Sequence, residues 1–127
     1  MTDPGTGWTY QVFSGWMLRP DGSLAGIGYS GFEDGRNNPA ADGVPDVGPI
    51  PVGLWHMGEP VDTLAHGPFV LPLTPDPLTD TKGRSGFLVH GDSISHPGFA
   101  SHGCIVIERS VREEMAASGD NLLEVII

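Results

Sequence analysis

Phe87-Leu88-Val89-His90-Gly91-Asp92 is followed, after a short gap, by Ala100-Ser101-His102-Gly103-Cys104-Ile105-Val106, and these two segments are the most informative part of the sequence. In its first half three apolar residues lead into a histidine, and in its second half an apolar run follows a cysteine. Short apolar runs bounded by glycine and polar residues are typical of buried β-strands. We therefore predict two strands, with His90 at the end of one and Cys104 at the start of the other.

Further strands are predicted on both sides of this stretch, from alternating or short apolar runs. Pro20-Asp21-Gly22 predicts a tight turn between two of them, because proline presets φ and glycine supplies the last turn position. Gly26 and Gly28 in the return strand indicate a bulge or a close approach by another backbone. The further strands are predicted at residues 8–13, 16–19, 23–29, 50–57, 69–73 and 122–127.

One helix and one long loop are predicted between the strands. Ser110 with Glu113 three residues later has the spacing of a capping box, and Gly119 is placed to end the helix. Residues 31–48 are polar and rich in glycine, asparagine, aspartate and proline, so we predict a loop that lies over the functional site. The predicted fold is mainly β, with one short helix late in the sequence.

The composition fits a single β-rich domain over residues 1–127. A chain of 127 residues can bury a real core but is too short for two domains. Its 19 glycines and 12 prolines, scattered between short apolar runs, predict many turns. The single cysteine cannot form an intramolecular disulfide, so packing and backbone pairing must stabilise the fold.

The charge balance argues against a nucleic-acid partner. Six Lys and Arg residues against sixteen Asp and Glu residues give a formal net charge of −10, which repels a phosphate backbone. An acidic chain attracts basic partners, such as a cognate inhibitor, although a merely soluble acidic surface explains the same charge. Partner identity is therefore left open by charge alone.

The sequence predicts neither a signal peptide nor membrane insertion. Residues 1–7 lack both the positive charge and the apolar stretch of a signal peptide, and no run approaches the roughly 18 apolar residues of a membrane span. We expect a soluble chain that does not use the general export route.

Cys104 and His90 have the chemistry of a thiol nucleophile and its base. A thiol attacks an amide carbonyl as thiolate, so it needs an imidazole within reach and hydrogen-bond donors for the oxyanion. His90 lies fourteen residues upstream (104 − 90), a separation that two neighbouring strands can bring into contact. Gly103 allows a tight turn, in which the N–H groups of Gly103 and Cys104 could converge on the oxyanion.

Two other interpretations of the cysteine compete with this one. A lone cysteine at the start of an apolar strand is often a small buried hydrophobic residue. Here, however, the preceding Ser-His-Gly consists of polar residues and glycine, which are unusual next to a core position. Zinc binding is the second rival, although no paired spacing such as C-x-x-C or H-E-x-x-H is present, and we expect neither a metal nor a cofactor. The zinc ligands would be His90, His96, His102 and Cys104.

Ser101-His102-Gly103-Cys104 with the upstream His90-Gly91 resembles the active-site signature of L,D-transpeptidases. The resemblance implies a β-sandwich or barrel-like domain with a cysteine nucleophile. Two features depart from the signature. Only ten residues separate His90 from Ser101 (101 − 90 − 1), and Val106 stands where the family has Asn or Arg.

A resemblance to the Tlde1 family covers most of the chain. Members of that family are L,D-transpeptidase-related toxins that type VI secretion delivers into the periplasm of rival bacteria, a route that needs no signal peptide. The matching segments are Trp8-Thr9-Tyr10, Gly28-Tyr29-Ser30-Gly31, Asn37-Asn38-Pro39, Gly48-Pro49-Ile50-Pro51-Val52-Gly53, Gly83-Arg84, Phe87 to Asp92 and Ala100 to Val106.

The resemblance implies roles for the motif residues. Cys104 would be the nucleophile and His90 its base, while Ser101, His102 and Gly103 would shape the site, with His102 counted among the catalytic residues. The substrate would be a peptidoglycan tetrapeptide stem, cleaved between diaminopimelate and the terminal D-Ala through a Cys thioester. Water would complete an L,D-carboxypeptidase reaction, and a D-amino acid would complete an exchange.

Several other residues have a candidate role and a plain structural alternative. Asp92, after Gly91, could orient His90 or serve as an ordinary turn residue. Arg84 could bind a substrate carboxylate with its guanidinium fork or be a solvated loop charge. Tyr29 could line a cleft, although core packing explains it as well. No role is assigned to His56, His66 and His96.

Two different functions therefore remain open. A catalytically inactive wall-binding or structural module of a phage or secretion particle would keep the fold and bind without Cys104. A thiol hydrolase on another amide would share the nucleophile and differ in substrate. Digestion of stem peptides by the wild-type chain and by a variant without the thiol separates these alternatives from the peptidoglycan enzyme.

Overall fold

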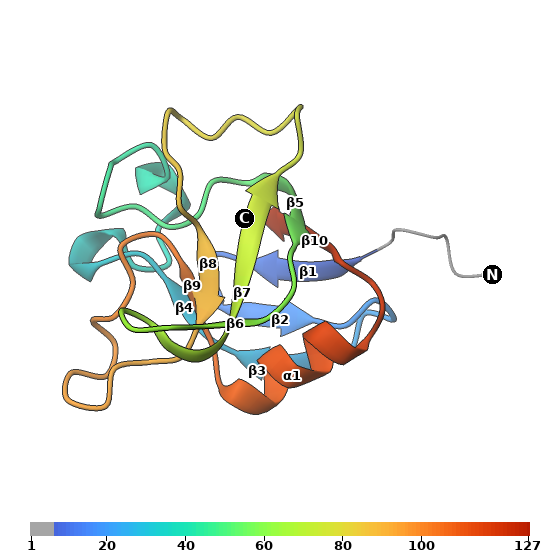
Figure 1. Ribbon diagram of the computed structural model, residues 1–127. Coiled ribbons are helices and arrows are strands. Elements are labelled where there is room, and N and C mark those ends of the chain that lie inside the picture. Colours follow the sequence, from blue (N-terminus) through green and yellow to red (C-terminus); the bar gives the residue numbers. More distant parts are fainter. Residues whose placement is uncertain (1–6) are drawn as a thin grey trace.

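The computed structural model describes residues 7–127 and is mainly β, with one short helix, as the sequence predicts (Figure 1). Residues 1–6, where a signal peptide was not expected, lie outside the described part. No helix in the described part has the length and hydropathy of a membrane span. The elements are β1 (Trp8–Gln11), β2 (Trp16–Leu18), β3 (Leu24–Ile27), β4 (Tyr29–Ser30), β5 (Gly53–Met57), β6 (Val61–Thr63), β7 (Gly67–Pro75), β8 (Leu88–His90), β9 (Ile105–Val106), α1 (Arg109–Ala117) and β10 (Leu122–Ile126).

The strands form one sheet that bends back on itself. Its order is β3-β2-β1-β10-β5-β7-β8-β9-β4, with β6 paired to β7 outside this path. β3 and β4 stand at opposite ends of the path, yet only Gly28 separates them in the chain. The two ends of the sheet must therefore meet at Gly28, which gives the sandwich or barrel-like fold that the motif resemblance implied.

Gly28 lies where two other backbone segments pass without room for a side chain. A Cβ atom on Gly28 would be 2.1 Å from the Val106 carbonyl oxygen, and one on Gly15 would be 2.0 Å from the Gly28 oxygen. The Gly28 N–H donates to the Gly15 carbonyl at 2.7 Å. The predicted close approach by another backbone is therefore confirmed at Gly28, whereas the close neighbour of Gly26 is the Val111 side chain.

The core lies between the bent sheet and the helix. β2 and β3 form the predicted hairpin, and alternate residues of β1, including Trp8 and Tyr10, are fully buried. Trp55 of β5 packs edge-on against Phe87 with ring centroids 5.1 Å apart, which connects the core to the segment before β8. Burial of such large side chains supplies most of the driving force for folding.

The helix starts two residues earlier than the capping-box spacing predicted. α1 begins at Arg109, its N-cap is Glu108, and no side chain caps it. Ser110 therefore lies inside the first turn, so the prediction that it caps the helix is wrong. The predicted end is confirmed, because Gly119 has φ +76° just beyond the C-cap Ser118, a conformation that glycine adopts without strain.

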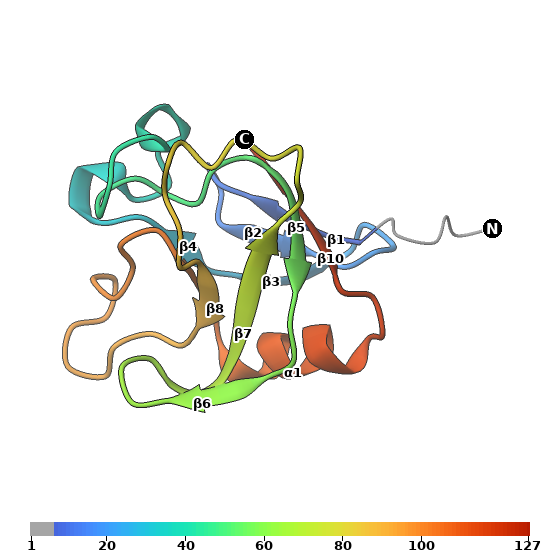
Figure 2. The same ribbon diagram turned by 45° about the horizontal axis from the view of Figure 1, so that its top comes forward.

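The loop of residues 31–48 folds into two short 3₁₀ helices, η1 (Glu33–Gly35) and η2 (Pro39–Ala41), instead of lying extended. Its two ends are joined by the bond from the Phe32 N–H to the Val47 carbonyl oxygen, 2.8 Å long. In Figure 2 this loop, coloured cyan to teal, stands beside the segment that leads into β9. It reaches the site through Pro45 and Asp46, as predicted.

Replacing Gly28 by alanine is expected to destabilise the fold by about 3 kcal/mol or more, because the new Cβ meets backbone that cannot move aside. Gly43→Ala is the matched control, since its Cβ would meet nothing closer than 3.8 Å. Urea unfolding of both variants measures the difference, and equal stability of the two would contradict this account of the closure.

Candidate active site

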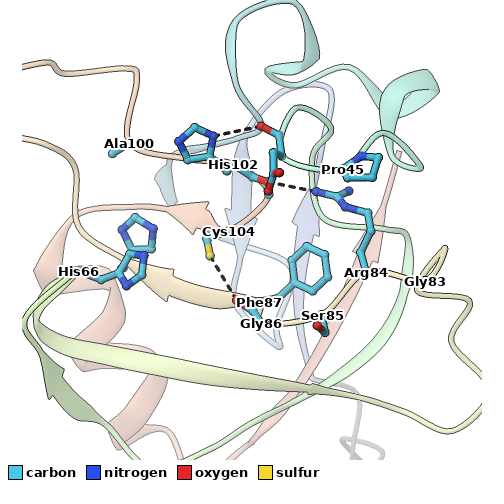
Figure 3. Close-up of a pocket in the computed structure, with 13 residues that line it drawn as sticks. Pro45, His66, Gly83, Arg84, Ser85, Gly86, Phe87, Ala100, His102 and Cys104 are labelled. Atoms are coloured by element: carbon cyan, nitrogen blue, oxygen red, sulfur yellow. Dashed lines mark hydrogen bonds between the residues drawn. The ribbon is translucent and has the colours of Figure 1, made fainter.

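The pairing of β8 with β9 brings His90 and Cys104 to one cavity. The two strands are parallel, with Val89 opposite Ile105 and His90 opposite Val106, and Cys104 directly precedes β9. The cavity has a volume of about 370 Å³, and Figure 3 shows the residues around it. Its lining residues are Pro45, Asp46, His66, Gly83, Arg84, Ser85, Gly86, Phe87, His90, Ala100, His102, Gly103 and Cys104.

Ser101 holds the turn that carries Cys104. Its side chain is fully buried, accepts hydrogen bonds from the N–H groups of Gly31 (2.9 Å) and Gly103 (3.2 Å), and donates to the Cys104 carbonyl (2.5 Å). Buried Ser30 adds a second support, because its hydroxyl donates to the Gly103 carbonyl at 2.9 Å. Ser101 therefore shapes the turn and has no surface to offer a substrate.

Only glycine fits at position 103. Its φ is +140°, and a Cβ atom there would lie 2.5 Å from the Arg84 guanidinium and 3.0 Å from the Phe87 ring. Its N–H points at the Ser101 hydroxyl. The expected pair of oxyanion donors, the N–H groups of Gly103 and Cys104, is therefore reduced to that of Cys104.

His90 is arranged as a neutral base. Its Nδ1 lies 2.7 Å from the Gly91 carbonyl oxygen, which can only accept, so Nδ1 carries the proton. Nε2 is buried and has no hydrogen-bond partner in the described part of the chain, which leaves its lone pair available. Burial lowers the pKa of His90, and the nearby charges of His66 and Arg112 lower it further. Gly91, which follows His90 in the motif, thus acts at the site through its carbonyl oxygen, which accepts the hydrogen bond from Nδ1.

Cys104 rests as a neutral thiol. The side chain is half-buried, and its Sγ lies 3.8 Å from the Gly86 carbonyl oxygen, to which the thiol proton points. Burial raises the pKa of Cys104, while the Leu88 N–H and the charge of Arg84 oppose that rise. A thiolate therefore forms when a base takes the proton, which is the function that the Nε2 atom of His90 can serve.

Alkylation of Cys104 by iodoacetamide tests this resting state. Because the pKa of the thiol is raised and only the thiolate reacts, the rate should reach half its maximum above the ordinary thiol pKa of about 8.5. The rate is measured by intact-mass spectrometry from pH 6 to 10, with the urea-unfolded chain as control. A midpoint below that of the unfolded chain would indicate a resting ion pair instead.

Arg84 is occupied by backbone carbonyls. Its two terminal nitrogens donate to four of them at 2.7–3.1 Å, and the guanidinium also lies over the Phe87 ring, 5.1 Å from its centroid. This differs from the expected fork on a substrate carboxylate, because the atoms of that fork are already used. Arg84 thus ties the 31–48 loop to the turn before Cys104. The four acceptors are the carbonyls of Asp42, Gly48, Pro49 and His102.

Arg84→Lys is expected to loosen this loop, because one ammonium group cannot bond four carbonyls in a plane. Hydrogen–deuterium exchange should become at least about tenfold faster for the amides of residues 42–49, a loss of about 1.4 kcal/mol in local stability. Lys82→Ala is the matched control, since its exposed ion pair with Asp42 contributes little. Equal exchange in both variants would argue against a loop held by Arg84.

Tyr29 and Asp92 hold the segment between His90 and Ser101. The Tyr29 hydroxyl donates to the Asp92 carboxylate at 2.6 Å and accepts from the Ala100 N–H at 3.0 Å. Asp92 also accepts from the Gly98 N–H. Burial and the Asp92 carboxylate raise the pKa of Tyr29 to about 12. Asp92 thus orders its own loop, and neither residue bonds the His90 ring.

Of the other histidines, His102 lies at the cavity and His56 lies outside it. His102 is at the cavity, where its Nδ1 donates to the Asp46 carbonyl (3.0 Å) and its ring stacks on Phe32. His56 is on β5, outside this cavity, and its ring interacts with the Asp76 carboxylate.

His66, which had no predicted role, lies at the site with its ring centroid 4.6 Å from that of His90. No spacing or motif around position 66 indicated this contact.

The residues named as possible zinc ligands do not share a metal-binding arrangement. His96 interacts with the Ser95 hydroxyl on an exposed loop, while His102 is engaged with Asp46. Within residues 7–127, no three His, Cys, Asp or Glu side chains are grouped as metal ligands. The geometry therefore supports thiol and imidazole chemistry at this site.

A second, larger cavity of about 1110 Å³ adjoins the first, and His66, His90, Ala100 and His102 line both. Together the two cavities contain three of the chain's six Lys and Arg residues but only three of its sixteen Asp and Glu residues. Half of the cations of this acidic protein thus lie at the site, where they balance the carboxylates, while the rest of the chain is strongly negative. The cations are Arg84, Arg109 and Arg112, and the carboxylates are Asp46, Asp92 and Glu108.

Comparisons with known proteins bear on the fold and the family. The fold is similar to the crystal structure of the helical cell shape determining protein Pgp2 from Campylobacter jejuni, with TM-score 0.55 and 16% identity. The match covers 98% of this chain and 51% of that one, so this chain spans about half its length. No curated protein matches the sequence. The family model of the Tlde1 domain matches residues 25–123, and the chain belongs to that family.

Proposed function

We propose that the chain is a cysteine L,D-carboxypeptidase and L,D-transpeptidase that acts on peptidoglycan tetrapeptide stems. The observation that carries the proposal is the His90 ring, whose Nδ1 is bonded to Gly91 while its buried Nε2 is free in the cavity of Cys104. A nucleophile, a base with a fixed tautomer and a backbone carbonyl that orients the base are the parts that acyl transfer needs.

In the first half of the proposed reaction, His90 Nε2 takes the thiol proton as Sγ attacks the carbonyl between diaminopimelate and the terminal D-Ala. The Cys104 N–H donates to the oxyanion that forms. As the C–N bond breaks, protonated His90 gives its proton to the leaving amine of D-Ala. The products are free D-Ala and a thioester between Cys104 and the tripeptide.

In the second half, His90 takes a proton from the attacking group. Water attack on the thioester releases the tripeptide, and attack by the amine of a D-amino acid gives an exchanged tetrapeptide. In both cases the C–S bond breaks and the thiolate recovers its proton from His90. The two outcomes differ only in which acceptor reaches the thioester.

The charge at the site supports an anionic substrate. Tetrapeptide stems carry several carboxylates, and the two cavities concentrate arginines and histidines in a chain with a net charge of −10. The three arginines and three carboxylates around the cavities balance, so this face repels an anionic substrate less than the rest of the acidic surface does. Arg109 is the most exposed of the cavity arginines and is the candidate for a direct contact.

Membership of the Tlde1 family supports a role in competition between bacteria. The Tlde1 domain defines a family of type VI secretion effectors. We propose that the chain is such an effector, that it acts in the periplasm of a target cell, and that a cognate immunity protein protects the producer. Its net charge of −10 favours a basic face on that immunity protein.

Digestion of purified disaccharide-tetrapeptide, followed by mass spectrometry with and without D-Met, tests the activity. The wild-type chain should remove D-Ala or replace it with D-Met, and Cys104→Ala should do neither. His90→Gln should lower the rate by about a hundredfold or more, since that is the usual loss when a general base is removed.

His56→Gln is the matched control, because this histidine lies outside both cavities, and it should keep the wild-type rate. An unchanged tetrapeptide in every sample, with Cys104 intact and the chain folded, would reject the proposed activity. Binding of peptidoglycan that survives Cys104→Ala would then favour the wall-binding module.

A further inference from the structure

His66 occupies the wall that the two cavities share. It lines both of them, together with His90, Ala100 and His102. In Figure 3 it lies on one side of Cys104, with Arg84 on the other. Its ring centroid is 4.6 Å from that of His90, with the ring planes inclined by 46°. The proposed base therefore packs against a second imidazole that is open to both cavities.

The backbone on both sides of this contact is held in place. The His66 N–H donates to the Thr63 hydroxyl at 2.8 Å, and the following Gly67 has φ +84°, which fixes the turn. Arg112, only 5% exposed, donates to the carbonyls of Pro68 and Phe69 and to that of Ile107.

The same guanidinium lies so close to Gly91 that a Cβ there would be 2.9 Å from its Nη2 atom. Arg112 thus buttresses both segments that carry the two imidazoles. The contact between the two rings therefore follows from the fold, because the backbone segments that carry both side chains are held in place.

The charged and titratable groups around His90 come from four different parts of the chain. Arg112 faces it from α1, His66 from the turn before β7, Asp92 from the segment after β8 and Cys104 from the turn before β9. Only Asp92 is a carboxylate, and it is engaged with Tyr29 and Gly98. A proton on His90 beside a protonated His66 and Arg112 would place cations in contact, so both neighbours oppose protonation of His90.

We propose that His66 is a positioning residue for His90: it holds the ring of the base and keeps it unprotonated as the pH falls. This rests on the proposed role of His90 as base. It makes no claim about the substrate, so it can be tested on the free chain without peptidoglycan. The consequence is an enzyme whose base stays available in mildly acidic surroundings.

The test is titration of His90 in the full-length chain, read from the ¹³Cε1 chemical shift of its ring by NMR. His66→Gln keeps a polar side chain of similar size without charge, and it should raise the His90 midpoint by about one pH unit, the scale of directly coupled sites. His66→Arg carries a fixed charge and should leave the midpoint at or below the wild-type value. His56→Gln should leave it unmoved.

A second readout follows the thiol. The midpoint of Cys104 alkylation lies above the pH range in which His90 titrates, so it should be the same in His66→Gln, His56→Gln and the wild type, which checks that the surroundings of the thiol are unchanged. A His90 midpoint unchanged in both His66 variants would overturn the proposal and leave His66 as packing alone. Loss of peptide digestion with the expected midpoint shifts would instead reject the proposed substrate and leave the role of His66 standing.

Discussion

The closure of the sheet at Gly28 is the constraint on which the rest of the structure depends. Two backbone segments pass this residue at distances that exclude even a methyl group. The chain can therefore cross from one end of the sheet to the other in a single residue, so that β4 pairs with β9. That pairing puts Ser30 beneath the turn that carries Cys104, where its hydroxyl bonds the Gly103 carbonyl. Tight packing at Gly28 thus helps to set the position of the turn that carries the thiol.

Patterns that act locally were enough to predict much of the fold. Alternating apolar residues gave the strands, Pro20-Asp21-Gly22 gave the hairpin, and Gly119 gave the end of the helix. The start of the helix was mispredicted because a capping box needs a hydroxyl at the N-cap, and here the extended backbone of Glu108 comes first. The paired glycines predicted a close contact, but not which strand would make it.

The site was predictable only in part, for a physical reason. The motif around Cys104 is continuous, so its residues and the upstream His90 could be named from the sequence. Arg84 bonds backbone carbonyls of a loop about forty positions away, and no sequence pattern marks a carbonyl as an acceptor. His66 meets His90 because of a turn and a buried guanidinium from the helix. Both contacts exist only once the chain has folded.

The place of β10 in the middle of the sheet has a consequence for how the chain folds. β10 lies between β1 and β5, and its parallel partner β1 begins 115 positions earlier, from Trp8 opposite Leu123 (123 − 8). During synthesis the earlier strands have no central neighbour to pair with until β10 has been made. Chains dominated by such distant pairings fold slowly, with strand edges exposed meanwhile. β10 thus joins β1 to β5, and with them the two parts of the sheet, last in the order of synthesis.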